Sequence, residues 1–118
     1  MKHPNYKLRK LVPVLIRINN TGGHVAVESM KDAQGIRFLC PKCYYENGGP
    51  MGTHQVICWF HGRGVPDDAP PGPGRWVAKG AGIDDLTLDA PPGKTRSVRL
   101  LGGCRWHGFV TGGSVDEA

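Results

Sequence analysis

The sequence predicts a mainly β fold with at most one short helix, in which a small twisted antiparallel sheet is held together by a zinc knuckle, as in a zinc ribbon. Three observations lead to this fold class. The 118 residues are only 39% hydrophobic and include 18 Gly and 10 Pro, so loops are abundant and the core is thin. The apolar runs are short, β-branched and separated by turn-forming residues. Four cysteines, two of them in a Cys-x-x-Cys pair, offer metal ligands that can stabilise such a fold.

The N-terminal part of the chain predicts a hairpin. Residues 11–18 are apolar and β-branched, and Pro13, which lacks a backbone donor, places the start of a strand after it. The Asn and Gly residues within 19–23 predict a turn. Residues 24–27 then predict a short return strand.

The next segment leads to the first cysteine. Residues 28–34 contain good helix formers ahead of Gly35, which predicts one or two helical turns that end at this glycine. Residues 36–39 predict a strand that delivers the chain to Cys40. The Asn-Gly-Gly-Pro sequence within residues 44–53 predicts an irregular loop.

The second half of the chain alternates short strands with turns. Residues 54–60 are an apolar, β-favouring run. Residues 62–74 contain four prolines, which exclude both a helix and a central strand, so this segment is expected to be an extended surface loop. Four further short strands are predicted over residues 76–79, 86–88, 97–101 and 109–111.

The chain is expected to be a single zinc-binding domain over residues 1–118, because no segment is apolar enough to form a second core. Its formal net charge is +5, and the excess lies at the N-terminus, where residues 1–10 are a candidate flexible basic arm. The five basic residues that precede the first acidic residue, Glu28, are Lys2, Lys7, Arg9, Lys10 and Arg17.

The sequence predicts a cytoplasmic protein of a bacterial host cell. The N-terminus does not have the pattern of a signal peptide, and no window approaches the roughly 18 apolar residues of a membrane helix. In a reducing compartment, closely spaced cysteines bind metal more often than they form disulfides. Neither a membrane nor a small-molecule cofactor is therefore expected as a partner, and Zn²⁺ is the expected cofactor.

The cysteines and histidines give two ways to complete a tetrahedral zinc site. Cys40 and Cys43 have the two-residue spacing that directs both sulfurs at one ion. Two Cys-x-x-His pairs could supply the other ligands, namely Cys58 with His61 and Cys104 with His107. The first pair is closer in sequence to the knuckle, whereas glycines on both sides of the second pair allow a close approach to a metal.

A set of short motifs resembles those of a family of small uncharacterised phage and prophage proteins. The resemblance covers about two thirds of the chain, from Gly35 to Val115. The motifs are Phe38 to Cys43, Gly52-Thr53-His54, Gly64 to Asp68, Gly74-Arg75-Trp76, Asp85-Leu86-Thr87 and Gly102 to Val110.

This resemblance favours the late pair as the remaining zinc ligands, because the late Cys and His are the firmer features of the family pattern. The predicted ligands are Cys40, Cys43, Cys104 and His107. An alternative arrangement uses His54, Cys58 or His61. The family implies no activity for this chain.

Basic residues suggest a second kind of site. A stretch without acidic residues lies between Asp89 and Asp116, and clustered basic side chains can attract phosphate groups. The candidate nucleic-acid-binding residues are Lys7, Arg9, Lys10, Arg96 and Arg99.

Taken together, the residues favour a zinc-stabilised, phage-type binding module whose partner is nucleic acid or a protein. The alternative is a zinc-dependent hydrolase or nuclease with an open metal site, formed by three of His54, Cys58, His61 and His107. The sequence contains no His-x-Glu partner of a zinc deaminase, no HExxH helix, no phosphate-binding loop and no nucleophile elbow, which argues against those enzyme classes.

Overall fold

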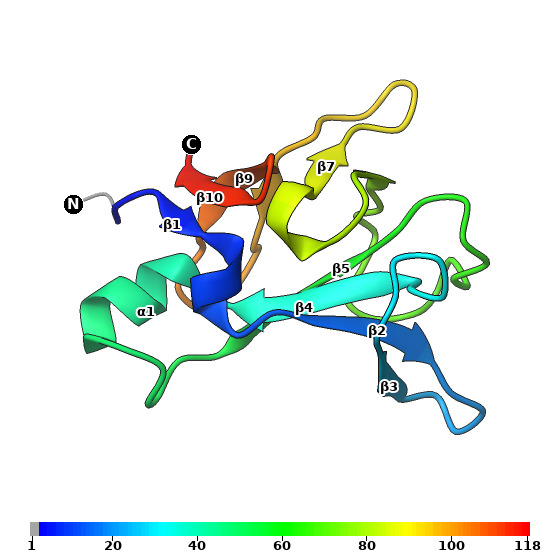
Figure 1. Ribbon diagram of the computed structural model, residues 1–118, viewed down its shortest axis with the longest axis horizontal. Coiled ribbons are helices and arrows are strands. Elements are labelled where there is room, and N and C mark those ends of the chain that lie inside the picture. Colours follow the sequence, from blue (N-terminus) through cyan, green and yellow to red (C-terminus); the bar gives the residue numbers. More distant parts are fainter. Residues whose placement is uncertain (1–2) are drawn as a thin grey trace.

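Residues 3–118 are described by a computed structural model, in which two four-stranded antiparallel sheets lie one above the other (Figure 1). The first sheet has the strand order β3-β2-β4-β5. Its β-branched apolar strands match the hairpin and the strand predicted from the sequence, and β2 begins directly after Pro13. The bounds are β2 Val14–Ile18, β3 His24–Val27, β4 Gly35–Leu39 and β5 Gln55–Trp59.

The second sheet joins the two ends of the chain and has the order β1-β10-β9-β8. The first and the last strand pair through Tyr6 and Val115, so residues more than a hundred positions apart are neighbours. The remaining strands form a separate two-stranded sheet, β6-β7. The bounds are β1 Tyr6–Lys7, β6 Val77–Lys79, β7 Thr87–Asp89, β8 Val98–Arg99, β9 His107–Thr111 and β10 Ser114–Glu117.

The one α-helix of the described chain lies elsewhere than the sequence predicts. Residues 28–34 form turns rather than a helix, because the backbone N–H of Gln34 donates to Ile16 in β2 and the Arg63 guanidinium donates to the carbonyls of Met30 and Ala33. The helix, α1, spans Pro41–Asn47 and directly follows Cys40. The prediction of a mainly β fold with at most one short α-helix is therefore confirmed, but the predicted position of the helix is wrong. The classification of the fold as a zinc ribbon and the assignment of residues 1–118 to a single domain remain predictions.

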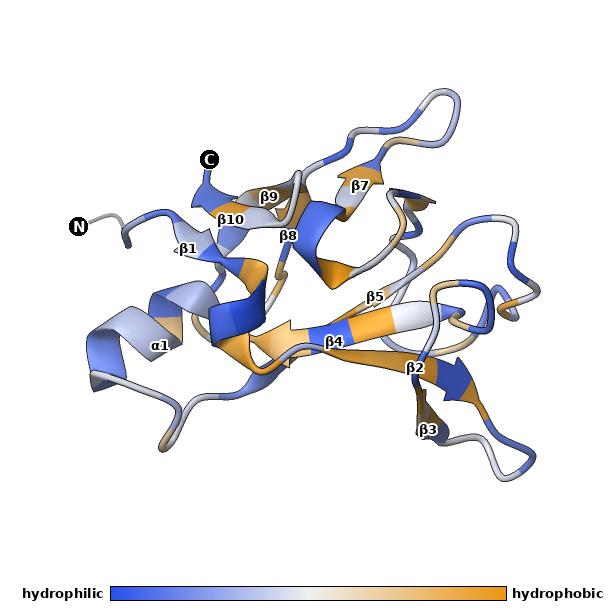
Figure 2. Cartoon of the chain, viewed as in Figure 1, coloured by the Kyte–Doolittle hydropathy of each residue, from blue (hydrophilic) through white to orange (hydrophobic). Residues whose placement is uncertain are grey.

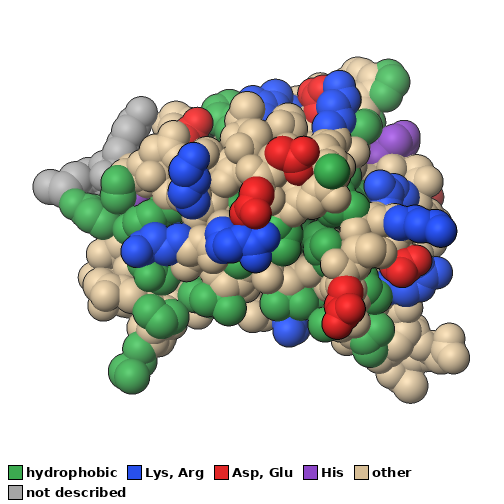
Figure 3. Space-filling view, viewed as in Figure 1, with side chains coloured by type: hydrophobic (Ala, Val, Ile, Leu, Met, Phe, Trp, Pro, Cys, Tyr) green, Lys and Arg blue, Asp and Glu red, His purple; other side chains and the backbone are tan. Residues whose placement is uncertain are grey.

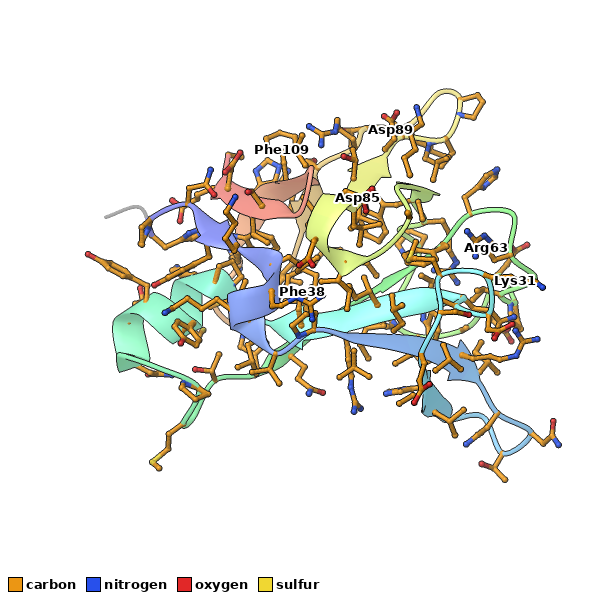
Figure 4. All side chains as sticks on the ribbon, in the orientation of Figure 1. Lys31, Phe38, Arg63, Asp85, Asp89 and Phe109 are labelled. Carbon is orange, nitrogen blue, oxygen red and sulfur yellow. The ribbon has the colours of Figure 1, made fainter. Side chains whose placement is uncertain are left out.

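The core draws residues from both sheets and includes the buried residues of β4, Val110 in β9, Val115 in β10 and Trp106. Hydrophobic residues dominate β2 and β4 (Figure 2). Phe38 in β4, labelled in Figure 4, is fully buried. Its ring meets that of Trp106 edge-on, with 6.2 Å between the centroids. Val110 and Val115 of the second sheet belong to the same core and are also fully buried. Aromatic edge-to-face pairs of this kind add to the stabilisation from buried area.

The basic N-terminal segment packs onto the domain. Leu8, in the short 3₁₀ helix η1 (Leu8–Leu11), is fully buried, and its backbone N–H donates to Gly113. His3 is buried, and its ring nitrogen Nε2 accepts a hydrogen bond of 2.9 Å from the indole N–H of Trp106. Part of the segment 3–10 therefore packs against the core, and a flexible basic arm over 1–10 stays a prediction. Residues 1 and 2, including Lys2, lie outside the described part of the chain.

Candidate metal centre

The first two thiols of the site come from the junction of β4 and α1. Cys40 immediately precedes α1 in an extended conformation, and Pro41 occupies the first helical position, where its missing N–H is not needed. The helix then returns Cys43 toward Cys40, and the backbone N–H of Cys43 donates to the Cys40 sulfur. The knuckle predicted from the Cys-x-x-Cys spacing is therefore formed by the first turn of a helix.

The third thiol comes from the turn between β8 and β9. The backbone N–H of Arg105 donates to the carbonyl of Gly102, and Arg105 has a φ of 56°, so the chain reverses sharply around Cys104. The backbone N–H of Trp106 donates to the Cys104 sulfur. The ammonium group of Lys42 donates to the Cys104 carbonyl at 2.9 Å, which ties the two turns together.

The fourth member of the group is His54, which directly precedes β5. β4 and β5 are antiparallel, and the backbone N–H of Cys40 donates to the carbonyl of His54 at 2.9 Å. The end of one strand thus lies beside the start of the next. The ring nitrogen Nε2 of His54 lies 3.4 Å from the Cys104 sulfur, and the side chain is exposed.

The four side chains form one compact group of ligand atoms. The sulfurs of Cys40, Cys43 and Cys104 and a ring nitrogen of His54 all lie within 4.8 Å of one another. The Cys40 and Cys104 sulfurs are 3.6 Å apart although their residues are 64 positions apart in sequence. Such a group can hold a metal ion.

Burial and hydrogen bonds give the three thiols different acidities. Burial raises the pKa of Cys40 to about 12, and it also raises the pKa of Cys43. For Cys104, burial acts in the same direction but is outweighed by hydrogen bonds from His54 and the Trp106 backbone, which lower its pKa to about 7. Because thiolates are the species that bind metals, an incoming ion must displace the protons of Cys40 and Cys43.

The structure brings three of the predicted ligands together and replaces the fourth. Cys40, Cys43 and Cys104 belong to the group, but His107 does not, and His54 from the alternative set takes its place. His107 begins β9, where it lies opposite Arg99 and its carbonyl accepts a hydrogen bond from Ala118. The spacing of Cys104 and His107, together with the family resemblance, predicted that both are ligands, whereas the structure places His107 in strand β9 and outside the group.

The other two alternative ligands lie outside the group. Cys58 is fully buried in β5 within the hydrophobic core, and this burial raises the pKa of its thiol. His61 is exposed beyond the end of β5, and its backbone N–H donates to Trp76. The competing Cys58–His61 pair is therefore divided between the core and the surface.

Strand pairing inferred from the sequence could have identified His54. The predicted strand over residues 36–39 ends at Cys40, and the next predicted strand in that region begins at residue 54. If the two strands pair antiparallel, the start of the second lies beside the end of the first. This register places His54 next to Cys40.

The candidate nucleic-acid-binding residues occupy several elements and are partly engaged within the protein. Arg9 forms an ion pair with Asp84 at 2.7 Å. Arg96 donates to the carbonyl of Val110 and stacks on Phe109 at 5.1 Å. On the face drawn in Figure 3, basic and acidic side chains lie interspersed. The remaining candidates are Lys7 in β1, Lys10 in η1 and Arg99 in β8.

Comparison of the chain with protein-family models, with curated proteins and with solved structures finds no match. The resemblance to phage and prophage proteins stays a prediction. Among the described residues, no helix combines the length and apolar character required to cross a membrane.

Proposed function

We propose that this protein is a zinc-stabilised binding module whose ion is held by Cys40, Cys43, His54 and Cys104. The observation that carries the proposal is the spacing of the ligand atoms. In a tetrahedral site with Zn–S bonds of about 2.3 Å, two sulfurs lie about 3.8 Å apart, and a sulfur and a nitrogen lie about 3.6 Å apart. The distances of 3.6 Å for Cys40–Cys104 and 3.4 Å for His54–Cys104 are close to both values.

The ligand types support zinc over the common alkaline-earth metals. Three thiolates and one imidazole are soft and borderline ligands, whereas Ca²⁺ and Mg²⁺ require oxygen ligands. Hydrogen bonds from the backbone N–H groups of Cys43 and Trp106 to ligand sulfurs orient the thiolates around the ion.

Four protein ligands would fill the coordination sphere of the ion. A catalytic zinc keeps an open position for water or substrate, whereas a structural zinc does not. The site therefore supports a structural role, and the protein would act by binding a partner. A phage or prophage setting and the bacterial cytoplasm belong to the same proposal.

The test compares the two histidines. Purified wild-type protein should contain one zinc ion per chain by elemental analysis. His54→Ala should lose most of its zinc, whereas the matched control His107→Ala should retain it. Substitution of cobalt for zinc gives a second measurement, because its visible spectrum reports tetrahedral geometry and thiolate ligation even in a weakened site.

Three outcomes would contradict the proposal. The first is wild-type protein that holds no zinc after purification and reconstitution. Zinc could be retained by His54→Ala and lost from His107→Ala, which would restore the ligand set first predicted from the sequence. An octahedral cobalt spectrum without thiolate charge-transfer bands would exclude the tetrahedral site.

A further inference from the structure

A large groove lies beside the metal centre, and its lining includes His54 and His107. Its volume is about 1050 Å³. It is bordered by β5, β8, the turn that carries Cys104 and the proline-rich residues 70–74. The apolar lining includes Ile57, Trp76 and Leu101, the last of which is 76% exposed. An apolar surface of this kind, next to strands, is a candidate site for a partner.

One wall of the groove is the free edge of the first sheet. The carbonyl of His54 and the backbone N–H of Phe60 both form hydrogen bonds toward β4, with Cys40 and Gln34 as partners. In an antiparallel pair, only every second residue directs its backbone groups at the neighbouring strand. The backbone N–H and C=O of Ile57, which lies between these positions, therefore point away from β4.

This edge already accepts one neighbouring segment. At the end of β5, the outward carbonyl of Trp59 accepts a hydrogen bond of 3.1 Å from the backbone N–H of Trp76. Phe60 and Trp76 then form an isolated parallel β-bridge. Further toward the groove, the outward N–H and C=O of Ile57 form no hydrogen bond with any described residue. The start of the strand therefore offers a vacant edge adjoining a segment that is already paired.

The lining of the groove also contains a second strand edge. β8 is the last strand of its sheet, and the backbone N–H of Leu100 donates to Trp106 on the β9 side. By the same alternation, the backbone groups of Arg99 point away from β9. The groove is thus lined by strand edges of both sheets.

The charge of the lining favours an acidic partner. Arg99 is exposed, and its guanidinium forms no ion pair or hydrogen bond with any described residue. The lining contains no Asp or Glu, and its other ionisable side chains are those of His54 and His107. A carboxylate in this groove would therefore meet a free cation and no acidic side chain of the lining.

From this arrangement we propose that the groove binds an extended peptide segment of a partner protein, which pairs with the free edge of β5 at Ile57 and directs an acidic side chain at Arg99. Pairing of a peptide with an exposed strand edge supplies backbone hydrogen bonds, and the apolar walls select alternate side chains. The inference rests on the proposed binding module and names its partner. The metal would hold the turn that forms one end of the groove.

The experiment selects ligands from a displayed library of random ten-residue peptides with immobilised, zinc-loaded protein. Enriched peptides should combine alternating apolar residues with an Asp or Glu. Affinities of a synthesised winner are then measured by titration. Ile57→Pro removes the outward N–H without removing a bond to β4, and it should weaken binding about tenfold or more, equivalent to about 1.4 kcal/mol.

The matched control is a proline on the opposite edge of the same sheet. β3 is that edge, and Ala26 is exposed there and directs its backbone groups away from β2. Ala26→Pro should leave peptide affinity within about twofold of wild type. Arg99→Glu should weaken binding of the acidic peptide, and replacement of the peptide's acidic residue by Lys should restore it.

Zinc content is measured for every variant, which separates this inference from the proposed function. The inference is overturned if zinc-loaded protein enriches no peptide, or if Ile57→Pro and Ala26→Pro have equal effects. It is also overturned if a single-stranded oligonucleotide competes for the groove with a steep dependence on salt, because the partner would then be nucleic acid. Loss of zinc from the wild-type protein would instead contradict the proposed function.

Discussion

Asp85 is an exposed residue whose carboxylate fixes a turn through backbone hydrogen bonds. Its oxygens accept bonds of 2.9–3.0 Å from the N–H groups of Ala81 and Gly82, and these bonds lower the pKa of the carboxyl group. Because the folded-state pKa is below the unfolded one, this stabilisation is complete above about pH 4. It is lost as the pH falls through the folded-state pKa.

Asp85→Asn should therefore reduce the loss of stability caused by acid. We expect the melting temperature of the wild type to fall more steeply than that of Asp85→Asn below about pH 4, and both proteins to lose metal-dependent stability in parallel. Thermal unfolding across a pH series measures the difference. Asp68→Asn is the control, because the Asp68 carboxylate makes no hydrogen bond with a described residue. Equal slopes for wild type and Asp85→Asn would contradict the prediction.

Some ligands of the metal centre could be predicted from the sequence and others could not. The Cys40–Cys43 spacing is local, so it predicted a knuckle that the structure contains. The fourth ligand depends on the pairing of β4 with β5, which brings His54 to Cys40. Cys104 and His107 are close in sequence, but His107 lies in β9, opposite Arg99, and only Cys104 belongs to the metal centre. In this chain, spacing identified the ligands Cys40 and Cys43, which share one helical turn, and failed for His107, where a strand begins.

At the scale of elements, the β9–β10 hairpin requires a glycine at one crowded position. Gly108 is buried and pairs with Glu117, and a Cβ at this position would collide with the carbonyl oxygen of Asp116 and the ring of Trp106. We expect Gly108→Ala to lower the free energy of unfolding by about 1–3 kcal/mol, because the backbone at Asp116 and the buried indole of Trp106 would both have to move.

The matched control for this substitution is Gly102→Ala, six residues earlier. A Cβ at Gly102 would meet no atom within 4 Å, so the change in stability should stay within about 0.5 kcal/mol. Denaturant titration of both variants gives the comparison. A Gly108→Ala variant as stable as Gly102→Ala would show that the hairpin tolerates a side chain at this position.

The elements also show where local pattern is overridden. The strands β2, β4 and β5 follow from short apolar runs, and the sequence predicts each of them. Residues 28–34 have good helix propensity, yet hydrogen bonds donated by Arg63 and a hydrogen bond accepted by the carbonyl of Ile16 hold them as turns. Propensity is a weak preference that tertiary contacts override, and these partners are far away in sequence.

In the whole molecule, the metal would join segments that no single sheet connects. Cys40 and His54 adjoin the first sheet, whereas Cys104 lies in the turn between two strands of the second. The sheets otherwise meet through a core that includes Phe38 and Trp106. Ligation across 64 positions of sequence restricts the unfolded chain and adds a binding free energy that only the folded state gains.

Removal of the metal should therefore destabilise both sheets together. At a free zinc concentration about a thousandfold above the dissociation constant, ligation contributes about 4 kcal/mol, which corresponds to a melting temperature on the order of 10–20 °C higher in a domain of this size. A zinc chelator should lower the melting temperature by that amount, and added zinc should restore it. Cys104→Ser, which lacks a ligand, should not respond to the chelator. If the wild type releases its zinc and still melts at the same temperature, the core alone holds the two sheets together.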